Sequence, residues 1–173
     1  MEFCSLFSGS SGNCQYIKTE NTTILVDAGL SGKKIQQEIV NIGENPKKID
    51  AIFITHEHVD HIQGVGIMSR RLNVPVYANK KTWEAMCPYI GNIKSENIKI
   101  LDECAEIGDL SVMPFDISHD AAHPVGYNIF YKNKKISIVT DTGCINELII
   151  NKTMDSDLLL IESNHDEDMV LIG

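Results

Sequence analysis

The sequence lacks the signals of several protein classes. No apolar run in its 173 residues approaches the roughly 18 residues that a membrane span needs. The N-terminus, MEFCSLFSGSSGN, has neither a basic segment nor a sustained apolar stretch, so we find no secretion signal there. We therefore expect a cytoplasmic protein that does not associate with a membrane.

Paired cysteines and an excess of basic residues are also absent. The five cysteines form no C-x-x-C pair and their number is odd, which fits reduced thiols better than a disulfide framework or a structural zinc site. Fifteen Lys and Arg residues stand against 24 Asp and Glu residues, for a net charge of −9. This balance argues against a general nucleic-acid-binding surface, which is normally basic. Bound cations can nevertheless supply positive charge inside a site.

Strand and helix patterns alternate along the chain, without an internal repeat, a low-complexity segment or a linker. The predicted strands cover residues 2–8, 14–19, 22–29, 49–55, 74–79, 98–101, 110–118, 125–132, 134–141 and 156–163. The second and third of these strands are predicted to form a hairpin. The predicted helices cover residues 31–43, 60–73, 81–90 and 145–151, and Ser31 is the predicted N-cap of the first. This order predicts one domain, residues 1–173, with a layered α/β fold. Because the chain stops just past its last predicted strand, we expect it to be the front part of a longer protein.

One stretch is dense in side chains that bind metals. AIFITHEHVDH, residues 51–61, contains His56, His58 and His61, with Asp60 between the last two. The cluster follows a buried strand, and ligand sites in α/β proteins favour the carboxyl ends of strands. Imidazole and carboxylate groups suit zinc and neighbouring divalent metals. Since a catalytic ion usually takes about three protein ligands, four so close together indicate two ions, each completed by residues elsewhere.

Two further side chains repeat this arrangement of a strand followed by a ligand. His119 follows the predicted strand 110–118, and Asp141 stands at the end of the predicted strand 134–141. The alternatives are an ordinary loop histidine for His119 and a helix-cap or turn aspartate for Asp141. We favour the ligand interpretation for both. For His123 we favour an ordinary loop histidine.

The loop SGSSGN, residues 8–13, is the candidate for substrate contact. Ser10, Ser11 and Asn13 offer polar groups, and successive backbone N–H groups in such a glycine-containing turn can bind an anion. A plain hairpin loop fits the same residues equally well. In NKKTW, residues 79–83, the lysines and Trp83 could contact nucleic acid, but we favour a solvated helix start and a core tryptophan.

With these residues in place, the chain resembles the metallo-β-lactamase-fold hydrolases. The matching residues are His56, His58, Asp60, His61, His119, Asp141 and Asp27, the last within ILVDAG. The segments SLFSGSSGNCQYI, HDAAHPVGY and ESNHD resemble the YycJ/WalJ (VicX) group, which is considered nuclease-like. The resemblance implies an α/β fold, a four-layer αββα sandwich, in which the C-terminal part of the second half is missing.

The resemblance also implies how the ligands are divided. One ion would be held by His56, His58 and His119, a second by Asp60 and His61, and Asp141 would bridge them. Asp27 would support the ligands from behind. The family's last histidine ligand lies further along the chain than His165. We therefore expect that ligand to be absent, and His165 to be a supporting or substrate-side residue.

A dinuclear metal-dependent hydrolase is the function that these residues favour. Two divalent ions, zinc or manganese with iron as an alternative, would provide a metal-bridged hydroxide as nucleophile. Asp60 would orient the water, and His119 would lie near the leaving group as a proton donor. The resemblance favours a phosphodiesterase, an exonuclease-like enzyme acting on DNA or RNA. The alternatives are a small-molecule hydrolase of a thioester, lactone or phosphoester, and a truncated, non-catalytic metal-binding protein. A homodimer is left open.

Overall fold

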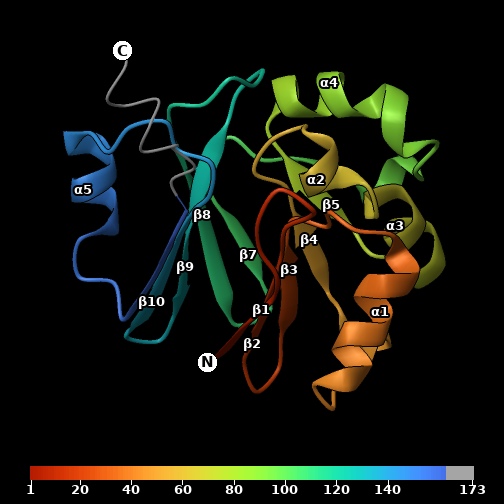
Figure 1. The fold of residues 1–173 in the computed structure, drawn as a ribbon. Helices are drawn as coiled ribbons and strands as arrows, with labels where there is room; N and C mark the ends of the chain where they lie inside the picture. The colour runs from red at the N-terminus through yellow and green to blue at the C-terminus, as the bar shows by residue number, and fades with distance from the viewer. Residues whose placement is uncertain (163–173) are drawn as a thin grey trace.

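Two sheets pack face to face in the computed structural model, which describes residues 1–162 of the chain. Figure 1 shows α1, α3 and α4 outside the first sheet and α5 outside the second, so that the layers run helix, sheet, sheet, helix. The layered α/β fold predicted from the sequence is confirmed, and so is the four-layer order. Among the described residues, no helix is long and apolar enough to cross a bilayer.

The first sheet is mixed. Its strands are β1 (Glu2–Phe7), β2 (Cys14–Lys18), β3 (Thr23–Val26), β4 (Ala51–Phe53), β5 (Val76–Ala78) and β6 (Ile98–Ile100), in that spatial order. The first three pair antiparallel, which confirms the predicted β2–β3 hairpin, and β3 to β6 pair parallel. Parallel pairing brings the carboxyl ends of β3 and β4 to one edge, where Asp27 and His56 follow.

The second sheet has the order β11-β10-β9-β8-β7. Its strands are β7 (Ala105–Ile107), β8 (Leu110–Asp116), β9 (Val125–Tyr131), β10 (Lys134–Val139) and β11 (Leu158–Ile161). Since β9 is antiparallel to both β8 and β10, those two strands run in the same direction. Their carboxyl ends therefore lie at one edge, where His119 and Asp141 follow. The short strand β7 has no counterpart in the sequence prediction.

The helices begin at residues whose side chains cap them. They are α1 (Gly32–Asn41), α2 (Val59–Ile62), α3 (Val65–Leu72), α4 (Lys80–Ile90) and α5 (Glu147–Thr153), with short 3-10 turns at Pro46–Lys48 and Ser95–Asn97. Ser31 accepts a hydrogen bond from the N–H of Lys34, as its predicted capping role requires. Asn79 caps α4 in the same way, and the α4 residue Trp83 is buried, as predicted.

The single helix predicted over residues 60–73 is wrong, because the chain forms α2 and α3 with a break between them. At the break, the N–H of Gly64 donates to the carbonyl of Ala28, 2.8 Å away. A β-carbon on Gly64 would lie 2.3 Å from the carbonyl oxygen of Leu30. The glycine thus lets the loop after β3 approach the helices closely, and this contact holds that loop beside the histidine cluster.

Three apolar layers hold the sheets and helices in place. The first lies between the first sheet and its helices, the second lies between the two sheets, and a small third one packs α5 against the second sheet. In the second layer Tyr127 is fully buried, and its hydroxyl donates to the carbonyl of Ile54 at 2.7 Å. The N–H of Val125 donates to the carbonyl of Thr55 at 3.1 Å. These two bonds fix β9 of the second sheet to the residues just before His56.

Candidate metal centre

Four strand ends meet at one edge of the sandwich. Asp27 follows β3, His56 follows β4, His119 follows β8 and Asp141 follows β10. Asp27 and Asp141 both adopt left-handed backbone, with φ of 62° and 56°. This conformation is uncommon outside glycine, and Asp is among the few residues that tolerate it. The edge therefore carries two local conformations that turn a carboxylate towards the histidines.

A buried carboxylate lies behind the cluster. Asp27 is fully buried and accepts three hydrogen bonds of 2.8 Å each, from the N–H and the hydroxyl of Thr55 and from Nδ1 of His61. Because the carboxylate only accepts, Nδ1 of His61 carries a proton. His61 therefore presents its other nitrogen, Nε2, to the interior of the cluster, where Oδ2 of Asp141 lies 2.7 Å away.

The same threonine sets the orientation of His56. The hydroxyl hydrogen of Thr55 is directed to Asp27, so its oxygen accepts from Nδ1 of His56, 3.0 Å away. The Nε2 atom of His56 is then left with a lone pair. That atom is buried and has no hydrogen-bond partner among the described residues. Buried polar atoms are normally satisfied, so this unpartnered nitrogen needs an explanation.

His58 and His119 form the other side of the cluster. Nε2 of His119 lies 3.1 Å from Nδ1 of His58, and the ring centres of His56 and His119 are 4.7 Å apart. His58 and His119 come from different sheets, and both are only partly buried. The cluster therefore has a buried side at His56 and His61 and a side that solvent can reach.

Two groups of three side chains could each hold a metal ion. The first consists of His56, His58 and His119, and the second of His56, His61 and Asp141; within each group the ligand atoms lie within 4.8 Å of one another. The first group is the set predicted for one ion. Nitrogen and carboxylate donors at this spacing suit a divalent metal such as zinc, and the unpartnered nitrogen of His56 belongs to both groups.

Asp60 lies at the margin of this arrangement. Its carboxylate oxygen Oδ2 is 3.7 Å from Nε2 of His61, and a third of its side chain is exposed. It belongs to neither of the two groups formed by the described residues. The predicted role of Asp60 as a ligand of the second ion, and of Asp141 as the bridge, remains a prediction.

Charges in the cluster shift the pKa values of its members. Burial and the neighbouring histidines lower the pKa of His56 to about 2, which keeps its ring neutral. Burial also acts to lower the pKa of His61, but the carboxylates of Asp27 and Asp141 outweigh it and raise the pKa to about 10. Burial acts to raise the pKa of Asp141, yet the hydrogen bond from His61 holds it below its usual value. His61 and Asp141 thus form an ion pair in which His61 is buried and Asp141 is partly buried.

Glu57, between two of the histidines, ties the cluster to the loop that carries His119. Its Oε1 atom accepts from the N–H of Ala122 at 2.7 Å. Neither Glu57 nor Thr55 was singled out from the sequence. Both stand inside the ITHEH segment, but their partners, Ala122 and Asp27, are far away along the chain, and no spacing rule connects them.

The glycine-containing loop after β1 divides into an exposed and a buried part. Ser10 and Ser11 are exposed, whereas Asn13 is buried and its Nδ2 lies 3.0 Å from Nε2 of His61. The main chain of Asn13 is fixed as well, because its N–H donates to the carbonyl of Asp60 at 2.7 Å. Asn13 therefore packs against the cluster, and contact of all three side chains with substrate remains a prediction.

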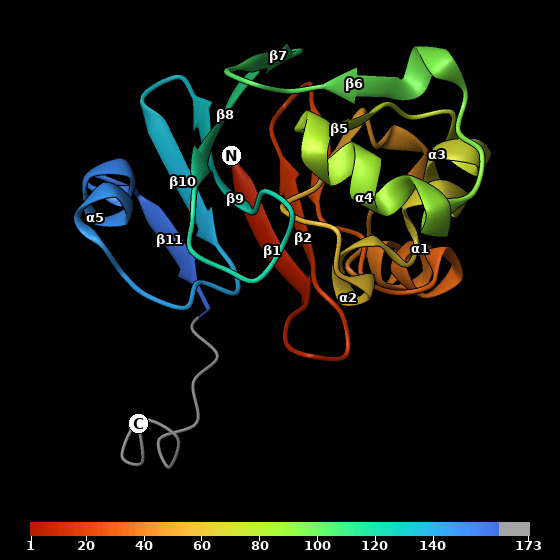
Figure 2. The ribbon, with the colours of Figure 1, turned by 90° about the horizontal axis from the view of Figure 1, so that it is seen from above.

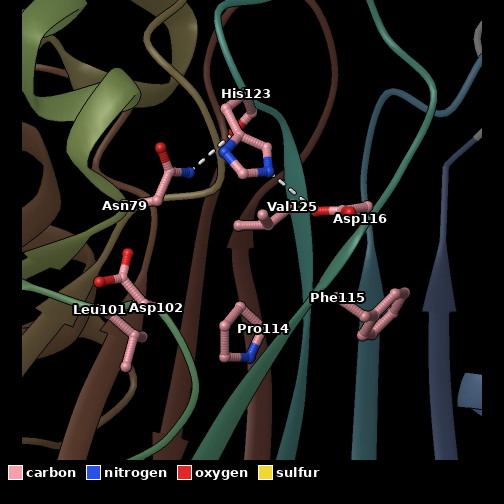
Figure 3. Close-up of a pocket in the computed structure, with 8 residues that line it drawn as sticks. All are labelled: Asn79, Leu101, Asp102, Pro114, Phe115, Asp116, His123 and Val125. Atoms are coloured by element: carbon pink, nitrogen blue, oxygen red, sulfur yellow. Dashed lines mark hydrogen bonds and ion pairs between the residues drawn. The ribbon is translucent and has the colours of Figure 1, made fainter.

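His123 lies apart from the cluster, at the pocket drawn in Figure 3. Its Nε2 is 2.9 Å from Oδ1 of Asp116, and its carbonyl accepts from Nδ2 of Asn79 at 2.8 Å. The pocket holds about 80 Å³, the volume of roughly two or three water molecules. That is well below the size of pockets for small-molecule ligands, so it offers no room for a substrate. His165, predicted with Asp27 to support the site, lies outside the described residues.

Comparisons with known proteins agree with this geometry. The model of the metallo-beta-lactamase superfamily matches residues 8–167. Exodeoxyribonuclease YycJ of Bacillus anthracis is 39% identical over 175 residues, a match that covers 100% of this chain and 66% of the relative. Exodeoxyribonuclease WalJ of Streptococcus pneumoniae is 40% identical over 176 residues, covering 99% and 65%. The resemblance to the YycJ/WalJ group is thereby confirmed, and the chain spans about two thirds of the length of these relatives.

Solved structures show the same fold at low identity. Zn(2+)-bound PqqB from Methylobacterium extorquens superposes with a TM-score of 0.73 at 18% identity, covering 92% of this chain and 63% of that one. A metallo-beta-lactamase with a HARLDQ motif from Cronobacter sakazakii gives a TM-score of 0.71 at 16% identity, covering 88% and 74%. At such identities the likeness establishes the fold alone.

Proposed function

The chain belongs to the metallo-beta-lactamase superfamily, and on that premise we propose that it is a metal-dependent phosphodiesterase that acts on nucleic acid, with DNA as the favoured substrate. The metal-dependent part rests on the Nε2 atom of His56, which is buried, has no hydrogen-bond partner among the described residues and belongs to both groups of ligand atoms. The substrate part rests on the relatives named exodeoxyribonucleases.

We propose that two divalent ions bind, with zinc favoured and manganese and iron as alternatives. His56, His58 and His119 would hold one ion, and His61 with Asp60 the other, with Asp141 between them. Nitrogen and carboxylate donors of this kind suit zinc. When bound, such ions activate a water molecule for attack and neutralise charge that develops on the substrate.

The chain's own residues would orient the reaction. Asp27 holds His61 with Nε2 facing inwards, and Thr55 does the same for His56. The partly exposed carboxylate of Asp60 can accept the proton that the attacking water loses. His119 would bind the metal through one ring nitrogen, and its role as a proton donor stays a prediction.

A small-molecule hydrolase remains the second candidate, and the acidic composition favours it for uncharged substrates. The net charge of −9 repels polyanions at long range. A panel of single-stranded DNA, duplex DNA, RNA, a thioester and a lactone, each with zinc or manganese added, separates the two candidates. Cleavage of the nucleic acids alone supports the proposal, and cleavage of the thioester or lactone alone would refute it.

Metal content tests the site itself. We expect about two ions per chain by elemental analysis, and a loss of at least one in the His56→Ala variant. His123→Ala is the matched control, because it removes a histidine that lies outside both groups. Equal metal content in the two variants would show that the cluster is not the metal centre.

A further inference from the structure

A groove between helices α1 and α3 has the chemistry of an anion-binding surface. It encloses about 250 Å³, roughly the volume of eight water molecules. The side chains that line it are those of Lys33, Gln36, Gln37, Val40, Pro46 and Arg71. Two of them are cations and two are carboxamides, and no carboxylate is among the described residues that line the groove.

The two cations are exposed and not engaged with acidic side chains. Within residues 1–162, neither Lys33 nor Arg71 forms an ion pair. The lysines that do form ion pairs lie on other elements: Lys18, Lys80, Lys94, Lys132 and Lys134. The described lining of the groove therefore carries two positive charges and no negative one, in a chain whose net charge is −9.

The carboxamides add directed hydrogen-bond donors. Nε2 of Gln36 donates to the carbonyl of Gly32 at 2.9 Å, and Nε2 of Gln37 donates to Oδ1 of Asn41 at 3.0 Å. Each amide nitrogen carries two hydrogens and uses one of them in these bonds. The second hydrogen of each can therefore be donated to a ligand, beside the charges of Lys33 and Arg71.

The loop that leads into helix α1, which lines the groove, packs on the metal centre. Helix α1 begins at Gly32, and the loop that leads to it from Asp27 packs on the cluster, since the N–H of Gly29 donates to the carbonyl of Asn13 at 2.8 Å. Both Figure 1 and Figure 2 show α1 and α3 side by side in the outer layer. From Lys33 to Val40 the helix rises about 10 Å, the length of about three phosphates along one strand of a duplex.

We propose that the α1–α3 groove binds consecutive phosphates of a nucleic-acid strand whose scissile linkage lies at the metal centre. The inference rests on the proposed function, because that function makes nucleic acid the expected polyanion. It resolves the conflict between an acidic chain and a polyanionic substrate, since the attraction comes from one local surface. Lys33 and Arg71 supply the charge, and the two glutamines direct the phosphate oxygens.

The test measures binding of a hydrolysis-resistant, phosphorothioate-linked single-stranded oligonucleotide to the metal-loaded protein over a range of salt concentrations. A plot of log affinity against log salt has a negative slope, and each lost phosphate contact reduces its steepness by about 0.7. At 0.1 M salt this corresponds to an affinity about fivefold weaker. For Lys33→Gln combined with Arg71→Gln, we expect the steepness to fall by about 1.4 and the affinity to be about 25-fold weaker. The control Lys132→Gln, on the turn after β9, should match the wild type.

Three outcomes would overturn the groove assignment. The first is an unchanged slope in the double variant, and the second is no oligonucleotide binding by the wild type. The third is that the double variant loses binding to phosphatidylglycerol vesicles but retains oligonucleotide binding, which would assign the groove to a lipid surface. Hydrolysis of a small chromogenic phosphodiester by the wild type is measured separately. The wild type could fail to hydrolyse this substrate while the double variant still shows a weaker salt dependence of oligonucleotide binding than the wild type. That result would refute the proposed function and leave the groove assignment in place.

Discussion

The substitution Asp27→Asn tests how the buried carboxylate organises the cluster. It preserves the shape of the side chain but replaces one acceptor oxygen by an NH₂ group. The native carboxylate accepts from the N–H and hydroxyl of Thr55 and from Nδ1 of His61, all at 2.8 Å. Whichever way the new amide is turned, at least one of these donors faces another donor. In both orientations, the negative charge beside His61 is also lost.

The expected magnitudes follow from these contacts. A buried donor left without an acceptor costs about 1–3 kcal/mol, so we expect the free energy of unfolding to fall by at least that amount. Loss of a carboxylate that orients a ligating histidine typically weakens metal binding 10- to 100-fold, or about 1.4–2.8 kcal/mol. Urea denaturation measures the first effect, and competition with a chromogenic zinc chelator measures the second.

Asp50→Asn provides the matched control. The Asp50 carboxylate accepts from the N–H of Thr23 at 2.8 Å, but the residue is exposed and belongs to neither candidate ligand group. An asparagine oxygen can keep that bond, so we expect a change in stability within about 0.5 kcal/mol and no change in metal affinity. Wild-type metal affinity in Asp27→Asn would refute the idea that Asp27 sets the orientation of His61.

Three further substitutions test other contacts. Glu57→Ala should weaken metal binding by freeing the loop held through Ala122, whereas Glu57→Gln keeps an acceptor oxygen and should retain affinity in the same chelator competition; equal loss in both would refute this role. Gly29→Ala would place a β-carbon 1.6 Å from a backbone oxygen and should cost about 1–3 kcal/mol, while Gly143→Ala, with its nearest atom at 3.5 Å, should have little effect on the melting temperature. Tyr127→Phe removes the 2.7 Å bond between the sheets and should lower the free energy of unfolding in urea by about 1–3 kcal/mol; an unchanged value would show that this bond adds no stability.

The sequence predicted the parts of the fold that local patterns determine. Alternating apolar residues located the strands, and Ser31 marked the start of α1, because both signals lie within a few residues of the element they define. The break between α2 and α3 was missed. It depends on Gly64 meeting the loop after β3, and that contact joins residues that are distant along the chain. The short strand β7 was missed because three residues carry too little pattern.

The cluster shows the same division between local and distant signals. His56, His58, His119 and Asp141 could be found because each follows a strand, and strands of the same direction end at the same edge. The residues that hold these side chains in position could not be found in this way. Thr55 looks like any strand-end threonine until the fold places Asp27 behind it. Burial of Asn13 against the cluster likewise depends on how the first loop folds, which its glycines leave open.

The tautomer of His56 limits how ions can share the centre. Its Nδ1 is bound to Thr55, so it offers one nitrogen, although it belongs to both candidate ligand groups. One lone pair cannot serve two ions, and a second ion would have to draw on His61, Asp141 and a further donor. Among the candidates for that donor, Asp60 lies 3.7 Å from Nε2 of His61 and reaches solvent. The division of ligands implied by the family resemblance is compatible with the single nitrogen that His56 offers, and it stays a prediction.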